Sequence, residues 1–313
     1  LVHAEPFLFV LDRPEYWQWF RVSVGVLLYR ALAVRHALGS HRPITHRGIV
    51  KREPLLKAAP LLGGAIYQDA RGDDLGLVRS NIAAARQGGA RILEETHVRV
   101  NITPDGIAAT LPEGGVLHAK ALMLALGPWT DAVRAEIGLP DRRLVAGTQG
   151  IHITFSLDRL PLSHAIALRH PLDHRVMFCL PEPERRRVIV GTTDTETMEL
   201  PDSLTVGDDD VRYLLRATRH LFPDVGLGEG DIEERWAGLR PLLRQRGHPD
   251  ARTREHLVVR EERVVTVAGG KLTTYRKMAE EAVDVVGDVL GVVLPKCVTA
   301  EVPLPVVIPS EGA

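Results

Sequence analysis

The chain has 313 residues, of which 45% are apolar and 25% are charged, and its net charge is −1. This is the composition of an ordinary globular protein, long enough for about two domains of ~150 residues. Without excess positive charge, no nucleic acid partner is expected, and any anion site must be local. The only two cysteines, Cys179 and Cys297, favour a reducing, cytoplasmic setting. No spacing of potential ligands indicates a metal site, so no metal is expected.

Residues 1–60 are expected to form a mainly helical segment. An apolar start at residues 7–11 leads into a helix-like run that contains Trp17 and Phe20. Its longest uninterrupted apolar stretch is well short of the ~20 residues that a membrane-spanning helix needs. Aromatic side chains beside arginines are also typical of helices that lie on a membrane surface. Core packing and contact with a membrane surface therefore both stay open for this helix.

Residues 61–141 indicate alternating helix and strand. Asp73 and Asp74 can cap a helix that Gly88 and Gly89 end. Strands are expected after it at residues 90–94, 98–103, 107–111 and 116–126. The last of these ends in a continuous apolar run, which is typical of a strand buried on both faces in a parallel sheet.

Residues 142–260 indicate a mainly β domain. Strands are expected at residues 150–156, 175–180, 187–191, 232–240 and 257–260, and a capped amphipathic helix at 208–222. Apolar and polar residues alternate over 150–156, which assigns His152 to the polar face of its strand. Residues 261–292 then indicate a strand, a turn and a long helix over 272–290, and residues 293–313 a proline-rich tail or linker.

The turn Gly269-Gly270-Lys271 lies between that strand and that helix. Paired glycines let the backbone turn tightly and approach a ligand. The first N–H groups of a helix attract anionic or electron-rich atoms, and Lys271 adds a positive charge. By itself this pattern fits an anion or cofactor site and a plain turn with a solvated lysine about equally well.

Five turn motifs in this order resemble those of the FAD-dependent glycerol-3-phosphate dehydrogenases. They are Gly127-Pro-Trp-Thr-Asp, Gly147-Thr-Gln-Gly-Ile-His152, Gly191-Thr-Thr-Asp194, Gly238-Leu-Arg-Pro241 and Gly269-Gly-Lys-Leu-Thr-Thr-Tyr-Arg-Lys277. The resemblance implies a mixed α/β and α+β fold, in which a Rossmann-like FAD domain, here incomplete, is interwoven with an antiparallel-sheet substrate domain. Residues 61–141 and 261–292 would belong to the FAD domain, and residues 1–60 and 142–260 to the substrate domain.

The implied reaction is the oxidation of sn-glycerol 3-phosphate to dihydroxyacetone phosphate, with hydride transfer from C2 to flavin N5. The electrons would pass to a quinone or another acceptor, and the enzyme would be peripheral on the inner face of the cell membrane. The sequence gives no indication of the oligomeric state.

The resemblance also implies roles for individual residues. Arg254 matches the arginine that binds the substrate phosphate, and the alternative is an exposed arginine in a charged loop. Arg240 matches the arginine that stabilises charge at the substrate oxygen. His152 is the candidate general base, with a solvent-exposed histidine as the alternative. Lys271 would reach the substrate or the flavin edge. The expected cofactor contacts are Gly127, Pro128, Trp129, Gly191, Thr192, Asp194, Gly269, Gly270, Lys271, Leu272 and Thr273.

The chain departs from the family pattern at its start, because the Gly-x-Gly-x-x-Gly motif that holds the FAD pyrophosphate is absent from these 313 residues. We therefore expect an N-terminal truncation, and poor FAD binding by residues 1–313 alone. Two alternatives remain. One is a related flavin amine or amino-acid oxidase, which would need a carboxylate clamp in place of a phosphate site. The other is a truncated, non-catalytic fragment.

Overall fold

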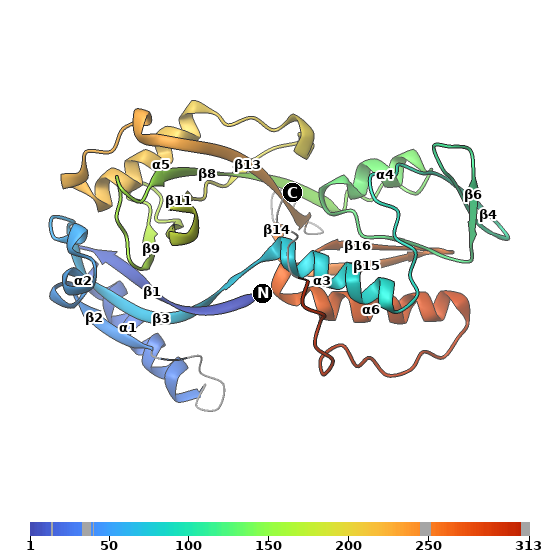
Figure 1. Cartoon of the computed structure of the whole chain (residues 1–313), viewed down its shortest axis with the longest axis horizontal. Coiled ribbons are helices and arrows are strands. Elements are labelled where there is room, and N and C mark those ends of the chain that lie inside the picture. The colour runs from blue at the N-terminus through green and yellow to red at the C-terminus, as the bar shows by residue number, and fades with distance from the viewer. Residues whose placement is uncertain (14, 33–38, 40, 245–251, 308–313) are drawn as a thin grey trace. The chain divides into compact units, whose positions relative to one another are not determined.

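The computed structural model describes residues 1–13, 15–32, 39, 41–244 and 252–307 (Figure 1). The chain divides into two compact units, each built from three separate segments. Unit 1 comprises Leu1–Asp73, Gln149–Thr195 and Leu204–Gly238, and unit 2 comprises Asp74–Thr148, Glu196–Ser203 and Leu239–Ala313. The expected mixture of helices and several sheets is confirmed.

Unit 1 is organised around a large, mainly antiparallel sheet. Its strands follow the order β13-β8-β11-β10-β9-β1-β3-β2, and β12 pairs with β8. The strands are β1 (Val2–Asp12), β2 (Arg42–Thr45), β3 (Leu61–Gly72), β8 (Val145–Ser156), β9 (Ala165–Arg169), β10 (Val176–Glu182), β11 (Arg187–Gly191), β12 (Thr195–Glu196) and β13 (Ile232–Arg244). The helices are α1 (Tyr16–Leu32), α2 (His46–Arg52) and α5 (Asp208–Leu221).

The N-terminal segment differs from the expected helical one, because β1 and β2 lie within residues 1–60. β1 pairs antiparallel with β3 from Val2 to Asp12. The close approach depends on Gly64, since a Cβ there would lie 1.9 Å from the carbonyl oxygen of Phe9. This long pairing joins β3 to unit 1, whose first segment runs from Leu1 to Asp73.

The core of unit 1 lies between the sheet and α5. The apolar stripe of α5 is fully buried at Leu214 and packs in one cluster with Phe155 of β8 and Ile166 of β9. Figure 1 shows α5 beside these strands. Cys179 belongs to this core, and burial raises the pKa of its thiol to about 12. A thiol with such a pKa stays protonated and is not a nucleophile at neutral pH.

Helix α1 exposes most of its apolar side chains in place of burying them. Trp17 and Phe20 are 67% and 54% exposed, and Leu32 is 87% exposed. Trp19, Val22 and Val26 are only partly exposed, and the indole of Trp19 lies against Gly63 of β3. No helix in the described part of the chain is both long and apolar enough to span a membrane. Residues 33–38, which were expected to extend this helix, lie outside the described residues.

Unit 2 contains two three-stranded sheets and three helices. One sheet has the order β4-β5-β6 and the other the order β15-β16-β7. The strands of these two sheets are β4 (Arg99–Thr103), β5 (Gly106–Thr110), β6 (Val116–Ala119), β7 (Leu122–Leu124), β15 (His256–Glu261) and β16 (Val264–Gly269). The short strand β14 (Arg252–Thr253) instead pairs antiparallel with β13 at the end of the large sheet. The helices are α3 (Asp74–Gln87), α4 (Thr130–Glu136) and α6 (Tyr275–Leu290).

Two expected strands of unit 2 differ from the structure. Residues 116–126 form two strands in different sheets, β6 and β7, with a break at Lys120. Residues 90–94 form no strand, because their backbone follows the Gly88-Gly89 turn without a pairing partner among the described residues. The parallel pairing expected for the apolar run is confirmed, since β7 pairs parallel to β16.

A buried ion pair joins α4 to β15 and β16. Arg134 is 1% exposed, and its Nη1 lies 2.6 Å from a carboxylate oxygen of Glu261 and 2.8 Å from the Thr266 hydroxyl. Its Nη2 donates to the carbonyl of Pro140. Hydrogen bonding from Arg134 is the largest effect lowering the pKa of Glu261, so this carboxylate is ionised at neutral pH. The full set of partners is what makes a buried guanidinium tolerable.

The first part of the proline-rich tail packs against α6. Leu294 lies over Gly287 of α6, where a Cβ would come within 2.8 Å of its side chain. Together α3, α6 and residues 294–304 line a mainly apolar groove of about 520 Å³. Residues 308–313 lie outside the described part of the chain.

Candidate functional site

In unit 2, the carboxyl ends of two parallel strands meet at one edge of a sheet. β7 ends just before Gly127, and β16 ends at Gly269. Because the register pairs Leu122 with Val264 and Leu124 with Thr266, both glycine turns leave the sheet at this edge. Open α/β sheets bind their ligands outside the carboxyl ends of parallel strands. The two turns therefore mark the part of unit 2 best suited to a ligand.

The turn at Gly269 and Gly270 requires glycine at both positions. Their φ angles are +71° and +89°, a left-handed region that other residues rarely adopt. A Cβ on Gly269 would lie 2.6 Å from the carbonyl oxygen of Glu255, and one on Gly270 would lie 2.3 Å from Sδ of Met278. The N–H of Gly270 donates to the carbonyl of Glu255 at 2.8 Å. This bond holds the backbone next to Arg254 at the same turn, and the Arg254 side chain is exposed, as in the alternative reading of this residue.

The turn at Gly127 is also fixed by its own sequence. Gly127 has a φ of +53°, and the hydroxyl of Thr130 donates to its carbonyl at 2.7 Å. A Cβ on Gly127 would lie 4.0 Å from Pro241, the residue after Arg240. The Gly127 turn of unit 2 therefore approaches β13 at Pro241, the residue that follows the expected substrate residue Arg240 in the sequence.

The start of the helix after Gly270 is open to solvent. A short 3₁₀ turn, Leu272–Thr274, leads directly into α6. Lys271, Leu272 and Thr273 are all exposed, although leucine is usually buried. The first N–H groups of a helix have no acceptor within the helix. Lys271 and these N–H groups form a positive, accessible helix start, as the sequence predicted.

In unit 1, His152 of β8 lies opposite Gly191 of β11. A Cβ on Gly191 would lie 2.2 Å from Cδ2 of the imidazole, so only glycine leaves room for this ring. The ring of Trp236, from β13, stacks on the imidazole with a centroid distance of 5.3 Å and an interplanar angle of 19°. His152 is half-buried and held between two neighbouring strands, unlike the freely exposed histidine of the alternative reading.

The loop after Gly191 contains the expected cofactor residues Thr192 and Asp194. The N–H of Ile151 donates to the hydroxyl of Thr193 at 3.1 Å, which ties the loop to β8. Nη1 of Arg175 donates to the carbonyl of Asp194 at 2.8 Å. Two bonds therefore hold the loop at Thr193 and Asp194, directly after Thr192.

An aromatic group beside His152 was missed in the sequence. The register puts Phe178 opposite Gly191 on the face that carries His152. Phe7 meets Phe178 edge-to-face with centroids 6.2 Å apart, and Tyr67 lies opposite Phe7. Burial, with Asp69 as a smaller contribution, raises the pKa of Tyr67 to about 12, so its hydroxyl stays protonated. The signal was the alternation of aromatic residues over 7–11, which a strand explains and a helix does not.

The predicted residues therefore fall into two groups. Unit 1 gathers His152, Gly191, Thr192 and Asp194, and unit 2 gathers the rest: Gly127, Pro128, Trp129, Arg240, Arg254, Gly269, Gly270, Lys271, Leu272 and Thr273. Within the described side chains, no three His, Cys, Asp or Glu residues are grouped so as to hold a metal ion. The chemistry available is that of arginines, one lysine, one histidine and backbone N–H groups.

A comparison with family models identifies the class of protein to which this fold and these turns belong. A family model described as FAD dependent oxidoreductase matches residues 7–276. The chain belongs to this family of enzymes, and the expectation that its cofactor is FAD is confirmed.

Within that family, the chain is similar to glycerol-3-phosphate dehydrogenases. It is 31% identical to the aerobic glycerol-3-phosphate dehydrogenase of Bacillus subtilis, over 86% of this chain and 50% of that protein. The solved glycerol-3-phosphate dehydrogenase of Bacillus halodurans, complexed with FAD, is 29% identical with a TM-score of 0.76, over 97% of this chain and 55% of that one. The chain thus spans about half the length of the curated relatives that it matches.

A more distant structure shows how widely the fold is shared. Glycine oxidase from Geobacillus kaustophilus superposes with a TM-score of 0.63 at 20% identity, over 96% of this chain and 74% of that one. At this identity the likeness shows the fold alone. Fold does not decide between an alcohol and an amine substrate, so the site must.

Proposed function

We propose that this protein oxidises sn-glycerol 3-phosphate to dihydroxyacetone phosphate with FAD as its cofactor, and passes the electrons to a quinone or another acceptor. The observation that supports the proposal is the Gly269-Gly270-Lys271 turn at the carboxyl ends of β7 and β16, with the backbone of Glu255 bonded to Gly270 and Pro241 near Gly127, so that Arg254 and Arg240 are each next in sequence to a residue of this region. Two guanidiniums and an ammonium suit a phosphate dianion, whereas an amino-acid carboxylate needs only one.

The residues at these strand ends fit FAD on an observation independent of the family. The turns at Gly127 and Gly269-Gly270 have positive φ angles, and they bring bare backbone to the edge of the sheet. Lys271, Leu272 and Thr273 would hold the flavin ring with N–H groups at the helix start. When bound, FAD accepts the two electrons that leave C2 of the substrate as a hydride. Pro128, Trp129, Gly191, Thr192 and Asp194 are the further expected contacts.

The substrate residues divide the remaining tasks. Arg254 would bind the phosphate by charge-assisted hydrogen bonds, whose strength is similar before and during the reaction. Arg240 would stabilise negative charge as it develops on the C2 oxygen. An imidazole nitrogen of His152 would accept the proton of the C2 hydroxyl, and stacking on Trp236 would hold the ring in the required orientation.

The decisive experiment is an anaerobic titration of the full-length protein reconstituted with FAD. Glycerol 3-phosphate should bleach the flavin absorbance near 450 nm stoichiometrically, and glycine and sarcosine should not. Bleaching by glycine alone would favour the amine-oxidase alternative. Failure of the full-length protein to bind FAD would favour the non-catalytic alternative.

We also propose that α1 lies on an anionic membrane surface, on the inner face of the cell membrane. Trp17, Phe20 and Leu28 are each at least half exposed along one stripe of this helix, and Arg21 and Arg30 are exposed beside them. Residues 16–32 contain no acidic side chain. An apolar stripe flanked only by positive charge suits anionic lipid headgroups and the acyl chains beneath them.

Co-sedimentation with vesicles tests this attachment. The full-length protein should bind vesicles that contain phosphatidylglycerol and bind pure phosphatidylcholine vesicles weakly. The double substitution Trp17→Ser and Phe20→Ser should reduce binding about tenfold or more, since burying each aromatic side chain in the membrane contributes ~1.5–3 kcal/mol. Leu75→Ser on α3, which is 55% exposed, is the matched control and should bind normally. Unchanged binding of the double variant would refute the role of α1.

A further inference from the structure

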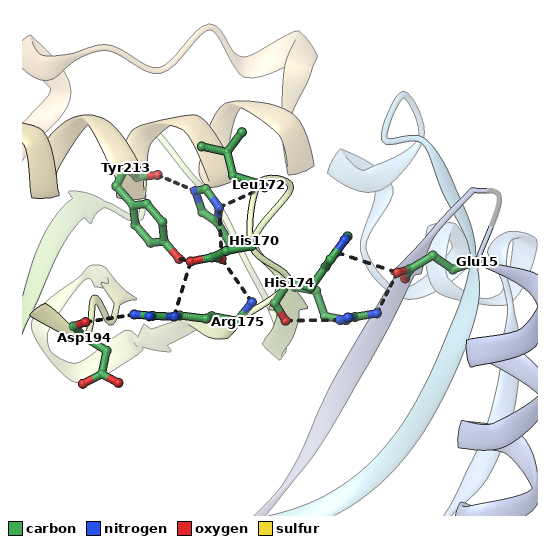
Figure 2. Close-up of polar contacts among 9 residues, drawn as sticks. Glu15, His170, Leu172, His174, Arg175, Asp194 and Tyr213 are labelled. Atoms are coloured by element: carbon green, nitrogen blue, oxygen red, sulfur yellow. Dashed lines mark hydrogen bonds and ion pairs between the residues drawn. The ribbon is translucent and has the colours of Figure 1, made fainter. Parts of the chain in front are cut away.

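The turn between β9 and β10, residues 170–175, is anchored to α5 by a buried histidine. His170 is 0% exposed, and its ring stacks on that of Tyr213 with centroids 3.6 Å apart and planes 5° apart. The N–H of Leu172 donates to Nδ1, so Nε2 carries the proton and donates to the carbonyl of Tyr213 at 3.1 Å. Both ring nitrogens are thus satisfied, and His170 is a fixed structural residue (Figure 2).

Two further anchors hold the same turn. The hydroxyl of Tyr213 lies 3.0 Å from both carboxylate oxygens of Asp173. On the opposite side, Nη1 of Arg169 lies 2.6 Å from a carboxylate oxygen of Glu15, and its Nε donates to the carbonyl of His174. Figure 2 shows Glu15 and Tyr213 on opposite sides of the turn. The backbone from which Arg175 projects is therefore rigid.

Arg175 extends from this turn to the loop that follows β11. Its Nη1 donates to the carbonyl of Asp194 at 2.8 Å, and its Nε lies 3.4 Å from Asp173. The Arg175 side chain is 53% exposed, so water can solvate the rest of its guanidinium. The bond to the Asp194 carbonyl therefore does not require a buried carboxylate to balance the charge of Arg175. Because a peptide unit is planar, a fixed carbonyl of Asp194 also fixes the orientation of the next N–H.

We propose that Arg175 is a positioning residue for the cofactor loop, residues 192–194. It acts through the Asp194 carbonyl, and the turn anchored by His170, Asp173 and Tyr213 gives it a fixed base. This inference rests on the proposed function, in which Thr192 and Asp194 contact FAD. Loss of the guanidinium would remove the bond that orients the Asp194 carbonyl, while the bond from Ile151 to Thr193 would remain.

The test compares three variants of the full-length protein: Arg175→Met, Arg175→Lys and Arg212→Met. Arg212 is the matched control, because it is 58% exposed and pairs only with Asp209 on its own helix among the described residues. Amide hydrogen exchange is measured across residues 192–196 without FAD, and FAD affinity is measured by fluorescence titration.

Arg175→Met should accelerate exchange in this segment and weaken FAD binding about tenfold, as expected for the loss of one hydrogen bond to a charged group. Arg175→Lys keeps one charged donor and should restore most of the affinity, to within about threefold of the wild type. Arg212→Met should change neither quantity.

Three results would overturn the proposal, and they are distinguishable. Unchanged FAD affinity in both Arg175 variants would do so, even with faster exchange, because Arg175 would then be merely structural. Equal loss in Arg175→Met and Arg212→Met would assign the effect to surface charge in general. A wild-type protein that binds no FAD would refute the proposed function, and this inference with it.

Discussion

The two units of this molecule are stabilised in different ways. Unit 1 packs its sheet and α5 around one extended apolar cluster, which includes Phe155, Ile166 and Leu214. Unit 2 has two small clusters, one around Leu124 and one around Leu243, and it adds the buried ion pair of Arg134. Unit 1 therefore has the larger apolar core, while unit 2 combines smaller apolar clusters with a buried ion pair that needs all of its partners.

This difference matches the distribution of the candidate site. Unit 2 carries most of the expected ligand contacts at turns and a helix start that are at least partly exposed, whereas the candidate base of unit 1, His152, is held within a packed sheet. A ligand that binds only the folded state stabilises it by mass action. Bound FAD should therefore contribute a larger share of the stability of unit 2 than of unit 1.

The strongest test of the comparison removes a buried aromatic ring from unit 1. Phe155→Ala should lower the free energy of unfolding by about 3–5 kcal/mol, because Phe155 is 0% exposed and removal of its ring leaves a cavity that its neighbours fill only in part. Leu124→Ala in unit 2 should fall near the lower end of the ~2–5 kcal/mol range, since few buried neighbours surround it. Urea denaturation measures both. A larger loss for Leu124→Ala would break the comparison, and Phe20→Ala on exposed α1 serves as the neutral control.

Removing the buried ion pair of Arg134 and Glu261 tests how much this polar contact stabilises unit 2. Arg134→Met should cost about 3–5 kcal/mol, because the Glu261 carboxylate would lose its most buried partner. Arg143→Met, which removes the exposed pair with Asp141, should cost less than ~1 kcal/mol. Equal costs in denaturant titrations would mean that burial of the Arg134 pair is unimportant.

The candidate site gives a kinetic prediction of somewhat smaller size. Arg240→Ala in the full-length enzyme should lower kcat about 10²–10³-fold, because it removes stabilisation of developing charge. Arg254→Ala should mainly raise KM, because phosphate binding is similar in the ground and transition states. Arg235→Ala, an exposed arginine on the same strand as Arg240, is the control for steady-state assays. Equal effects of the first two substitutions on KM alone would contradict the assigned roles.

The smallest expected effect is a pH dependence in unit 1. Burial lowers the pKa of His170 below 6.5, and Arg216 and His220 act in the same direction, while the Tyr213 carbonyl and Asp173 oppose them. Below pH 6.5 the unfolded chain binds a proton that the folded unit does not. The free energy of unfolding should therefore decrease as the pH is lowered from 6.5 to the folded pKa of His170. Above pH 6.5 the full stability is present.

Urea midpoints between pH 7.5 and 5 measure this slope. His170→Gln should flatten it, and His118→Gln, on exposed β6, should leave it unchanged. An identical slope in wild type and His170→Gln would assign the pH dependence to other groups.

The sequence was most informative where periodicity or glycine dominates. The amphipathic stripe of α5 and the long helix after Lys271 were predicted within a few residues, because side chains at helical spacing identify them directly. The parallel strand was predicted from its continuous apolar run. The turn residues were predicted because φ angles above zero, as at Gly269 and Gly270, leave little choice but glycine.

The failures concern long-range pairing. β1 was mistaken for the start of a helical segment. Its strand conformation is stabilised by hydrogen bonds to β3, which lies some fifty residues later, and the local sequence pattern does not reveal this partner. Trp236 and Arg175 were missed for the same reason: each acts on a residue of a different strand or loop. The roles of Arg240, Arg254 and His152 stay predictions until the kinetic tests above are done.

The pairing of β7 with β16 also constrains how the protein is made. β7 is an apolar strand, and the strand that covers its edge follows about 140 residues later in the chain. At ribosomal rates of roughly 5–20 residues per second, the nascent chain would wait roughly 7 to 28 seconds for that partner. During this interval an apolar strand edge is open to other chains. Synthesis of this fold should therefore depend on chaperones that hold nascent chains, and slow growth at low temperature should raise the yield of soluble protein.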